Sequence, residues 1–368
     1  MKFLHWHKSN SGKPDWLLIG IVLLLCAFGL LMVYDSSVAI AIRDFGNQYY
    51  YLTEQLKWFV VGLIVFFIFS VVDYRIYKKI ALPMLLGTVF LLLIVFIPGV
   101  GIKALGAKRW INLGFTVLQP AELAKLSLVI YLSAWFSTKE KNRLISFLIL
   151  IGMITGLIVL EPDLGTTLVI AATAITMYFF SGAPLAQFAV MIPVTILGVL
   201  GIAVASPYRF ARLTTFFNPE KDPLGASYHI HQATIALGSG GLFGVGIGSS
   251  RQKYEYLPEA NTDSIFAIIG EEIGFIGAVL IISAFLLVIW RGFRIARRTD
   301  DPFGKLLSLG ITSWIAYQVI MNIAAMVALI PLTGVPMPLL SYGGSSLIVV
   351  LAGLGILVNI SKSVAHGK

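Results

Sequence analysis

Charged side chains are scarce in this sequence, and cysteine is almost absent. Only 12% of the 368 residues are Asp, Glu, Lys or Arg, and 58% are hydrophobic, whereas about a quarter of a soluble domain is charged. Because the shortage extends along the whole length, we exclude a soluble domain with one anchor and predict a polytopic membrane protein. The one cysteine, Cys26, lies in an apolar run, which excludes disulfides and cysteine-based metal sites.

Other features are also lacking. We find no low-complexity segment, no convincing internal repeat and no separate soluble domain, so residues 1–368 are predicted to form a single transmembrane domain. No small-residue cleavage site follows the first apolar run, which is therefore predicted to be a retained helix rather than a signal peptide. The net charge is +9. Cytoplasmic loops of membrane proteins collect Lys and Arg, so we predict no nucleic-acid partner.

Ten stretches are long and apolar enough to be transmembrane helices, each of which needs about 20 residues. Between the seventh and eighth, the segment at about 206–263 is too long and polar to be a tight turn. The sequence thus predicts an all-α bundle with one long extracytoplasmic loop. The predicted spans are 16–34, 56–72, 80–97, 118–136, 144–160, 164–181, 184–205, 264–290, 304–330 and 338–360.

Basic residues predict the orientation. They precede the first helix and follow the second, fourth and eighth, so all of them fall on one side if the helices alternate. The positive-inside rule places that side, with both termini, in the cytoplasm. These residues are Lys2, Lys8, Lys13, Arg75, Lys78, Lys79, Lys139, Lys141, Arg143, Arg291, Arg294, Arg297 and Arg298.

Seven cations fall on the other side, against this rule. Gathered on one face, they could bind an anionic ligand outside the membrane, or they could be solvated or touch lipid headgroups. They are Lys103, Lys108, Arg109, Arg209, Arg212, Arg251 and Lys253.

The stretch 228–272 is too polar and too rich in glycine to cross a bilayer as one helix. Polar groups at this density are costly near lipid unless they line water or bind a ligand, so we predict the active site here. Asp263 could be the N-cap of the eighth helix, or a general base toward a sugar hydroxyl. Glu259 lies four residues earlier, and Glu271 and Glu272 lie inside the apolar helix, where carboxylates are usually functional.

Two further charged groups have alternative interpretations. Glu122 and Lys125 stand three apart on the fourth helix and share a face. They could neutralise each other, or Lys125 could point into a cavity and meet a phosphate. Glu161 and Asp163 flank Pro162 between two apolar runs. That turn could be an ordinary hairpin, or it could contribute to the site or to a divalent cation, although no ligand spacing here specifies a metal.

The glycine run 238–248 contains no Walker pattern, and no strand precedes it, so a nucleotide loop is disfavoured. Its glycines allow close backbone approach to a ligand, or a short re-entrant segment. His229 and His231, just upstream, are interpreted as ordinary loop residues. The segment 336–346 opens the last helix. Its small residues suit tight helix packing, and also suit a helix start whose amides face a ligand phosphate.

Four long motifs, in order and at family-like spacing, resemble the SEDS (shape, elongation, division and sporulation) family over nearly the whole chain. The stretches GIGSSRQKYEYLPEA and GLLMVYDSS are more similar to the FtsW branch of this family than to the RodA branch. Asn261 stands where many members have His, so we do not expect that position to be essential. The four motifs are GAKRWINLGFTVLQPAELAK, EPDLGTT, ALGSGGLFGVGIGSSRQKYEYLPEANTDSIFAIIGEEIGF and GVPMPLLSYGGSS.

The resemblance implies an enzyme of the bacterial cytoplasmic membrane that polymerises lipid II into β-1,4 glycan strands on the outer face during cell division. It implies that Asp263 is the general base and that Glu122 and Lys125 are the family's charged pair. The full set of expected substrate-binding residues is Arg109, Glu122, Lys125, Glu161, Asp163, Arg209, Arg212, Gln232, Ser239, Gly240, Arg251, Lys253, Glu259, Ser341, Gly343 and Gly344.

The resemblance also implies partners: lipid II itself, membrane lipid, a class B penicillin-binding protein of the FtsI type, and other divisome proteins. A divalent cation, Mg²⁺ or Mn²⁺, is considered as a cofactor without a specified ligand set. Two other functions use the same features. A lipid II flippase would need polar residues deep in several helices, whereas the charges here cluster toward the outer side. A scaffold that only recruits an enzyme would make Asp263 dispensable.

Overall fold

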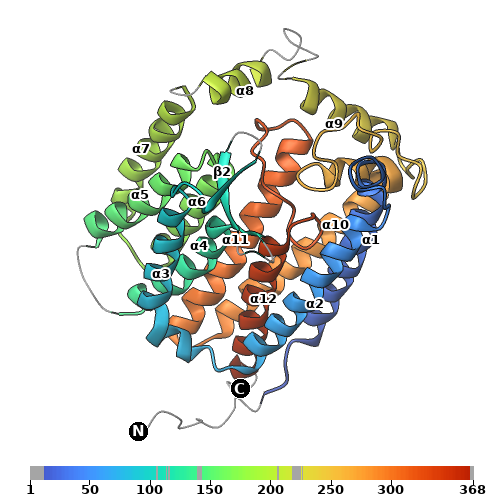
Figure 1. Ribbon diagram of the computed structural model, residues 1–368. Coiled ribbons are helices and arrows are strands. Elements are labelled where there is room, and N and C mark those ends of the chain that lie inside the picture. The colour runs from blue at the N-terminus through green and yellow to red at the C-terminus, as the bar shows by residue number, and fades with distance from the viewer. Residues whose placement is uncertain are drawn as a thin grey trace.

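In the computed structural model, the described part of the chain forms twelve helices and one small sheet (Figure 1). The described residues are 12–104, 107–112, 114, 117–138, 143–204, 207–217, 225 and 227–364, without the side chains of 103, 104, 203 and 207–209. The orientation signals Lys2, Lys8, Lys139 and Lys141 and the side chains of Lys103 and Arg209 therefore lie outside the described part.

Ten of the helices correspond to the ten predicted spans. Among the described residues, seven helices are long and apolar enough to cross a membrane, α5 and α6 are shorter apolar helices, and α4 carries the charged pair. The ten are α1 (Trp16–Phe45), α2 (Tyr50–Val71), α3 (Arg75–Ile94), α4 (Pro120–Phe136), α5 (Leu144–Leu160), α6 (Leu164–Phe180), α7 (Leu185–Val204), α10 (Ile265–Arg298), α11 (Pro302–Met326) and α12 (Gly344–Val364).

The helical class is confirmed, and three details of the prediction are corrected. Between α3 and α4 the chain forms a small antiparallel sheet of β1 (Gly101–Ala104), β2 (Ala107–Asn112) and β3 (Val117–Leu118). The segment 206–263 is not only loop, because it contains α8 (Pro207–Phe217) and α9 (Tyr228–Ser239). The last helix begins at residue 344 rather than 338, since the backbone at Leu339 has a φ of 65°, which no right-handed helix accepts.

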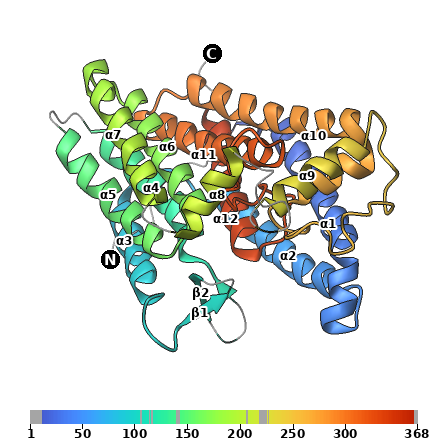
Figure 2. The same cartoon turned by 90° about the horizontal axis from the view of Figure 1, so that it is seen from above.

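The helices α11 and α12 lie in the middle of the bundle. In Figures 1 and 2, α1, α2 and α10 lie on one side of this pair and α3 to α7 on the other. Both central helices are buried along most of their length, whereas α7 exposes most of its apolar face. That exposure is expected for a helix surrounded by lipid, because lipid tails are themselves apolar.

Two polar junctions distinguish the ends of the bundle. At one end Asp15 caps α1, its backbone amide donates to Ser361 Oγ of α12 at 3.1 Å, and its carboxylate pairs with Arg291 of α10 at 2.6 Å. At the other end, the amide of Tyr342 donates to the carbonyl of Asn261 at 2.8 Å. The start of α1 and the end of α12 therefore share one end, and the residues that lead into α10 lie at the opposite end.

The helix α10 is broken at Gly274, whose φ and ψ are 68° and −170°. Glycine alone adopts this backbone region readily. The break removes the helical hydrogen bonds of the next two amides. The amides of Phe275 and Ile276 donate instead to the carbonyls of Gly241 and Leu242, at 2.9 and 3.1 Å.

The glycine-rich run 238–248 also donates hydrogen bonds to the carbonyls that precede the break in α10. The amides of Val245 and Gly246 donate to the carbonyls of Glu271 and Glu272, both at 3.0 Å. A Cβ on Gly244 would lie 2.1 Å from the Glu272 carbonyl oxygen, so the contact requires glycine. The run thus serves close backbone approach, but to α10 rather than to a ligand.

Replacing Gly274 with alanine is expected to destabilise the protein. The strained backbone region costs about 1–3 kcal/mol for a residue with a Cβ, and that Cβ would lie 2.3 Å from the Gly244 nitrogen. Gly87→Ala in α3 is the matched control, because a Cβ there meets nothing within 4 Å. Thermal unfolding of the detergent-purified protein measures both. Equal melting temperatures for the two variants would contradict the break as described.

Candidate active site

The backbone around Asp263 is fixed by side chains and amides from distant parts of the chain. The three carbonyls of residues 261–263 each accept one hydrogen bond. Their donors are the amide of Tyr342 at 2.8 Å, the hydroxyl of Ser341 at 2.6 Å, and Nδ2 of Asn322 on α11 at 2.8 Å. The segment that carries the candidate base is therefore held in place independently of its own loop.

The segment before α12 is itself clamped by Gln55 of α2. Nε2 of this buried side chain donates to the Ser341 carbonyl at 3.3 Å, and its Oε1 accepts from the Gly343 amide at 3.2 Å. Gly344 packs against the ring of Trp58, so close that a Cβ would lie 2.5 Å from it. The structure thus gives Ser341, Gly343 and Gly344 packing and tethering contacts within the protein.

Four charged groups act on the Asp263 carboxyl. Its pKa is raised to about 7, chiefly by burial and also by the negative charges of Glu259 and Asp163, while the positive charges of Arg212 and Arg109 oppose the rise. A group is an effective general base when its pKa is near the working pH. Residues from β2, the α5–α6 turn, α8 and the loop before α10 therefore contribute charge to one site.

The turn between α5 and α6 is tied to β2 by Arg109. Its Nε donates to the Glu161 carbonyl at 3.0 Å, and its Nη2 donates to the carbonyl of Pro162. Asp163 caps α6 by accepting from the Thr166 amide at 3.0 Å, so the acidic turn is in part an ordinary helix start. Arg109 and Asp163 nevertheless lie within electrostatic reach of Asp263.

The carboxylate of Glu161, unlike that of Asp163, does not cap a helix. The residue is fully buried, and neither carboxylate oxygen has a hydrogen-bond partner among the described residues. Burial, followed by the charge of Asp163, raises the pKa of Glu161 to about 8, and Arg109 opposes this. The carboxyl is therefore neutral near pH 7, which suits a proton donor better than a cation ligand.

His229 lies beside the site, although its sequence pattern marked it only as a loop residue. Nε2 of this α9 residue lies 2.5 Å from Ser264 Oγ, and that hydroxyl donates to the Pro258 carbonyl at 2.9 Å. The imidazole nitrogen is therefore the donor to Ser264. Burial, together with Arg212, lowers the pKa of His229 to about 4. No local motif signals this contact, because His229 and Ser264 are 35 residues apart.

Glu122 and Lys125 form a buried ion pair inside the bundle. Lys125 Nζ lies 2.8 Å from Glu122 Oε1 and 3.0 Å from Oε1 of Gln318 on α11, and it lies 5.4 Å from the centre of the Trp314 ring. Both charged side chains are at most 3% exposed. These contacts correspond to the mutually neutralising pair, one of the two interpretations that the sequence left open.

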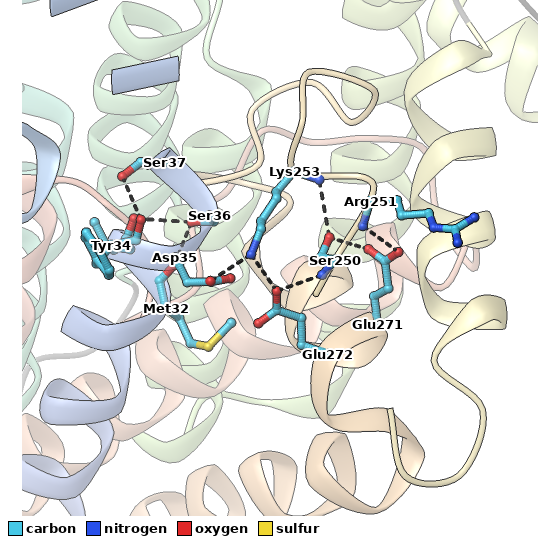
Figure 3. A network of polar contacts seen from close by, with 11 residues as sticks. Met32, Tyr34, Asp35, Ser36, Ser37, Ser250, Arg251, Lys253, Glu271 and Glu272 are labelled. Atoms are coloured by element: carbon cyan, nitrogen blue, oxygen red, sulfur yellow. Dashed lines mark hydrogen bonds and ion pairs between the residues drawn. The ribbon is translucent and has the colours of Figure 1, made fainter. Parts of the chain in front are cut away.

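Lys253 belongs to a second buried network, shown in Figure 3. Its Nζ lies 2.7 Å from Oδ1 of Asp35 on α1 and 2.9 Å from Oε1 of Glu272 on α10. Both contacts are buried. Lys253 therefore links the loop before α10 to two transmembrane helices, and its charge is compensated inside the protein.

The loop that carries Lys253 is also held by Glu271. The Ser250 hydroxyl donates to Glu271 Oε2, and the Arg251 amide donates to Glu271 Oε1 at 3.2 Å (Figure 3). The Ser250 amide donates to Glu272 at 3.1 Å. The two carboxylates inside α10 thus anchor the loop, whereas the Arg251 side chain is exposed.

The remaining candidates lie on α9, directly after it and in the loop before α10. Gln232 and Ser239 lie on α9, and the Ser239 hydroxyl donates back to the Ala236 carbonyl at 2.9 Å. A Cβ on Gly240 would lie 2.0 Å from the Gly270 carbonyl oxygen, so this position serves helix contact. Glu259 accepts from the Thr262 hydroxyl at 2.7 Å and acts on Asp263 through its charge.

A metal site is not built by the described residues. Among them, no group of three or more His, Cys, Asp or Glu side chains could hold a metal ion. Such a group would hold an ion on protein ligands alone, whereas Mg²⁺ usually keeps several waters and binds through one or two carboxylates together with substrate phosphates.

The fold and the site define a class of protein. Seven helices among the described residues are long and apolar enough to cross a membrane, and one end of the bundle carries a half-buried aspartate that is acted on by acidic and basic side chains. The molecule is a multi-pass membrane protein with a charged site at one end.

The particular family follows from comparison with known proteins. The family model for FtsW, RodA and SpoVE, described as "Cell cycle protein", matches residues 15–366. The chain belongs to this family.

Two curated relatives match over almost their whole lengths. Stage V sporulation protein E of Bacillus subtilis (strain 168) is 41% identical over 360 residues, covering 96% of this chain and 98% of the relative. A probable peptidoglycan glycosyltransferase FtsW of Geobacter sp. (strain M18) is 39% identical over 354 residues, covering 94% of this chain and 96% of the relative.

Solved structures have the same fold. One chain, described by the words "Structural coordination of polymerization and crosslinking by a peptidoglycan synthase complex", matches with a TM-score of 0.79 at 28% identity, covering 95% of this chain and 98% of that one. The rod shape determining protein RodA of Thermus thermophilus matches with a TM-score of 0.70 at 26% identity, covering 97% and 98%.

Proposed function

We propose that this chain is a peptidoglycan glycosyltransferase that polymerises lipid II into β-1,4 glycan strands during cell division. Family membership and full-length relatives named as peptidoglycan glycosyltransferases support this function. The observation that carries it is the Asp263 carboxyl, which is held by a tethered backbone and lies within reach of the charges of Arg109 and Arg212. This combination provides a base for a hydroxyl beside cations for a pyrophosphate.

The proposed reaction is a single displacement. The 4-hydroxyl of the acceptor's GlcNAc attacks C1 of the donor's MurNAc, and Asp263 takes the hydroxyl proton. The bond from C1 to the phosphate oxygen breaks as the new bond forms, and undecaprenyl pyrophosphate leaves with the electron pair. Attack from the opposite side inverts the α-linked phosphate into a β-1,4 linkage.

Arg109 and Arg212 are the cations that we assign to the leaving pyrophosphate. Their support is that both charges act on the Asp263 carboxyl, and fixed cations stabilise charge that develops in a transition state. Lys125 and Lys253 are assigned positioning roles instead, because each is held by buried carboxylates. We include a divalent cation only as a counter-ion of the substrate, and we assign it no step.

We further propose that Asp263 lies on the extracytoplasmic side and that both termini lie in the cytoplasm. The cluster of Arg291, Arg294, Arg297 and Arg298 at the Asp15 end of the bundle supports this through the positive-inside rule. The partner would be a class B penicillin-binding protein, as the relative solved within a synthase complex suggests. Its expected contact is the outer part of α10 and α11, including 328–338.

The test is polymerisation of labelled lipid II by the purified chain in detergent, with and without the cognate penicillin-binding protein. Glycan polymer is the expected product. Detergent abolishes sidedness, so a flippase would leave lipid II unchanged in this assay, and a scaffold would also leave it unchanged. The absence of polymer even with the partner present would contradict the proposed function.

The activity should also depend on pH. Asp263 must be ionised to accept a proton, and its pKa is raised to about 7, so kcat/KM is expected to fall about tenfold for each pH unit below 7 and to level off above 8. Glu259→Gln is the informative variant. Removing that negative charge should move the acidic limb to lower pH. The assignment would be contradicted if kcat/KM fell only near pH 4, or if Glu259→Gln did not change the pH at which kcat/KM falls.

A further inference from the structure

An apolar tip protrudes from the glycine-rich hairpin 241–247. Leu242 is 62% exposed, Phe243 is 79% exposed and Ile247 is 61% exposed. Large apolar side chains gathered at this exposure mark a contact surface. The proposed reaction uses none of them, and no described contact covers them.

The hairpin is continuous with the lipid-facing side of α10. The amide of Phe275, the first residue after the break, donates to the Gly241 carbonyl at 2.9 Å, and Phe275 is itself 63% exposed. Further along the same helix, Leu280 and Leu286 are 65% and 58% exposed. Because α10 is long and apolar enough to cross a membrane, these side chains face acyl chains, and the tip extends that surface.

The position of the break along α10 agrees with this environment. Phe275 and Trp290, which precedes the arginines at the other end of the helix, are fifteen residues apart. At 1.5 Å per residue this is about 22 Å, and the hydrocarbon core of a bilayer is about 30 Å thick. With Trp290 at the opposite edge of the hydrocarbon, the hairpin that packs on Phe275 would lie within its depth, in the leaflet on the Asp263 side.

The polar backbone groups at the break in α10 are hydrogen-bonded within the protein, as an apolar environment requires. A non-helical backbone at membrane depth is tolerated when its polar groups are satisfied within the protein. The amides of 275 and 276 and the carbonyls of 271 and 272 all find partners in the hairpin. Behind the tip, the Ser250 hydroxyl donates to Glu271 and the Ser250 amide donates to Glu272, both in buried positions, so the polar groups at Ser250 face inward.

We propose that the hairpin 241–247 is a re-entrant element whose tip contacts the acyl chains just beneath the headgroups of the leaflet on the Asp263 side. The glycines let it enter the break of α10, and Leu242, Phe243 and Ile247 supply the lipid contact. The element therefore sets the depth of the part of the loop that leads from the hairpin to Lys253. This lipid contact does not depend on the proposed reaction.

Site-directed spin labelling of the full chain tests the proposal. Cys26 is the one native cysteine and is buried, and a Cys26→Ala background removes residual labelling. A nitroxide is attached at Phe243→Cys, at Leu286→Cys as the lipid reference, and at Asp300→Cys, an exposed position between α10 and α11, as the water reference. The protein is reconstituted in vesicles of phosphatidylcholine and phosphatidylglycerol.

Collisions with oxygen, which partitions into the bilayer, and with a water-soluble nickel chelate are then compared. The label at 243 is expected to collide with oxygen as often as the label at 286, and at least several-fold less with nickel than the label at 300. Nickel access equal to that at 300 would overturn the proposal, because the tip would lie in water. Low access to both agents would also overturn it, because the tip would be covered by protein, including a second copy.

Discussion

Asp263→Asn is expected to reduce lipid II polymerisation by about 10²- to 10⁴-fold, the usual loss when a general base is removed. Asparagine has nearly the same shape but cannot accept the hydroxyl proton. The three carbonyls of 261–263 that fix the segment belong to the backbone, so the substitution leaves these tethers intact. The measurement is the initial rate of polymer formation from labelled lipid II, at saturating and at limiting substrate.

The stability of this variant separates lost chemistry from lost folding. Burial raises the pKa of Asp263 to about 7, so the fold disfavours the ionised form and loses stability as the pH rises from the unfolded pKa toward 7. A neutral amide avoids this cost. The melting temperature at pH 8 should therefore equal or exceed that of the parent.

A matched control is Asp44→Asn, which removes an exposed carboxylate paired with Arg43 at the end of α1 and should keep the parent rate. If Asp263→Asn polymerised lipid II at the parent rate, Asp263 would have no place in the mechanism. If it melted far below the parent, the loss of activity would reflect folding instead.

The second large effect is expected at the buried ion pair of α4. Lys125→Met removes the cation 2.8 Å from Glu122 Oε1 and leaves a buried carboxylate without its counter-charge. Breaking a buried pair on one side costs about 3–5 kcal/mol. We therefore expect a melting temperature many degrees lower and a poor yield of folded protein, measured by thermal unfolding and size-exclusion chromatography.

The double variant Glu122→Gln with Lys125→Met tests the cause. Removing both charges leaves no uncompensated ion, and replacing a whole buried pair is often close to neutral, so most of the lost stability should return. A double variant as unstable as the single one would contradict a mutually neutralising pair. A stable double variant without polymerase activity would instead assign Lys125 to the substrate phosphate.

Hydropathy was sufficient to predict ten helices, seven of which are, among the described residues, long and apolar enough to cross a membrane. A membrane span requires a long apolar run whatever its neighbours are. It failed where tertiary contacts decide the local structure. The break at Gly274 lies within an apolar run, and its freed hydrogen-bonding groups are satisfied by residues some thirty positions earlier. The start of α12 moved to residue 344 because the preceding residues bind the 261–263 segment instead of forming helix.

The site was predicted unevenly for the same reason. The sequence indicates Asp263 because this residue follows a polar stretch and precedes a predicted helix. In the structure, the charges of Arg109, Arg212 and Asp163 act on its carboxyl. Lys253 looked like an anion-binding cation because its partner Asp35 is 218 residues away. The contact of His229 with Ser264 likewise could not be predicted from a local pattern, because the two residues are 35 positions apart. Contacts between distant elements determine which charges are compensated, and the spacing of residues along the sequence does not reveal those contacts.

The tethering of residues 261–263 has a consequence for how the chain tolerates change. The position of the Asp263 backbone in the bundle is determined by Gln55, Asn322 and the stretch before the last helix. Length changes in the outer segment upstream of α9 should therefore be absorbed without displacing the carboxyl. We expect insertions there to alter which partners the surface meets while the geometry of bond formation stays the same.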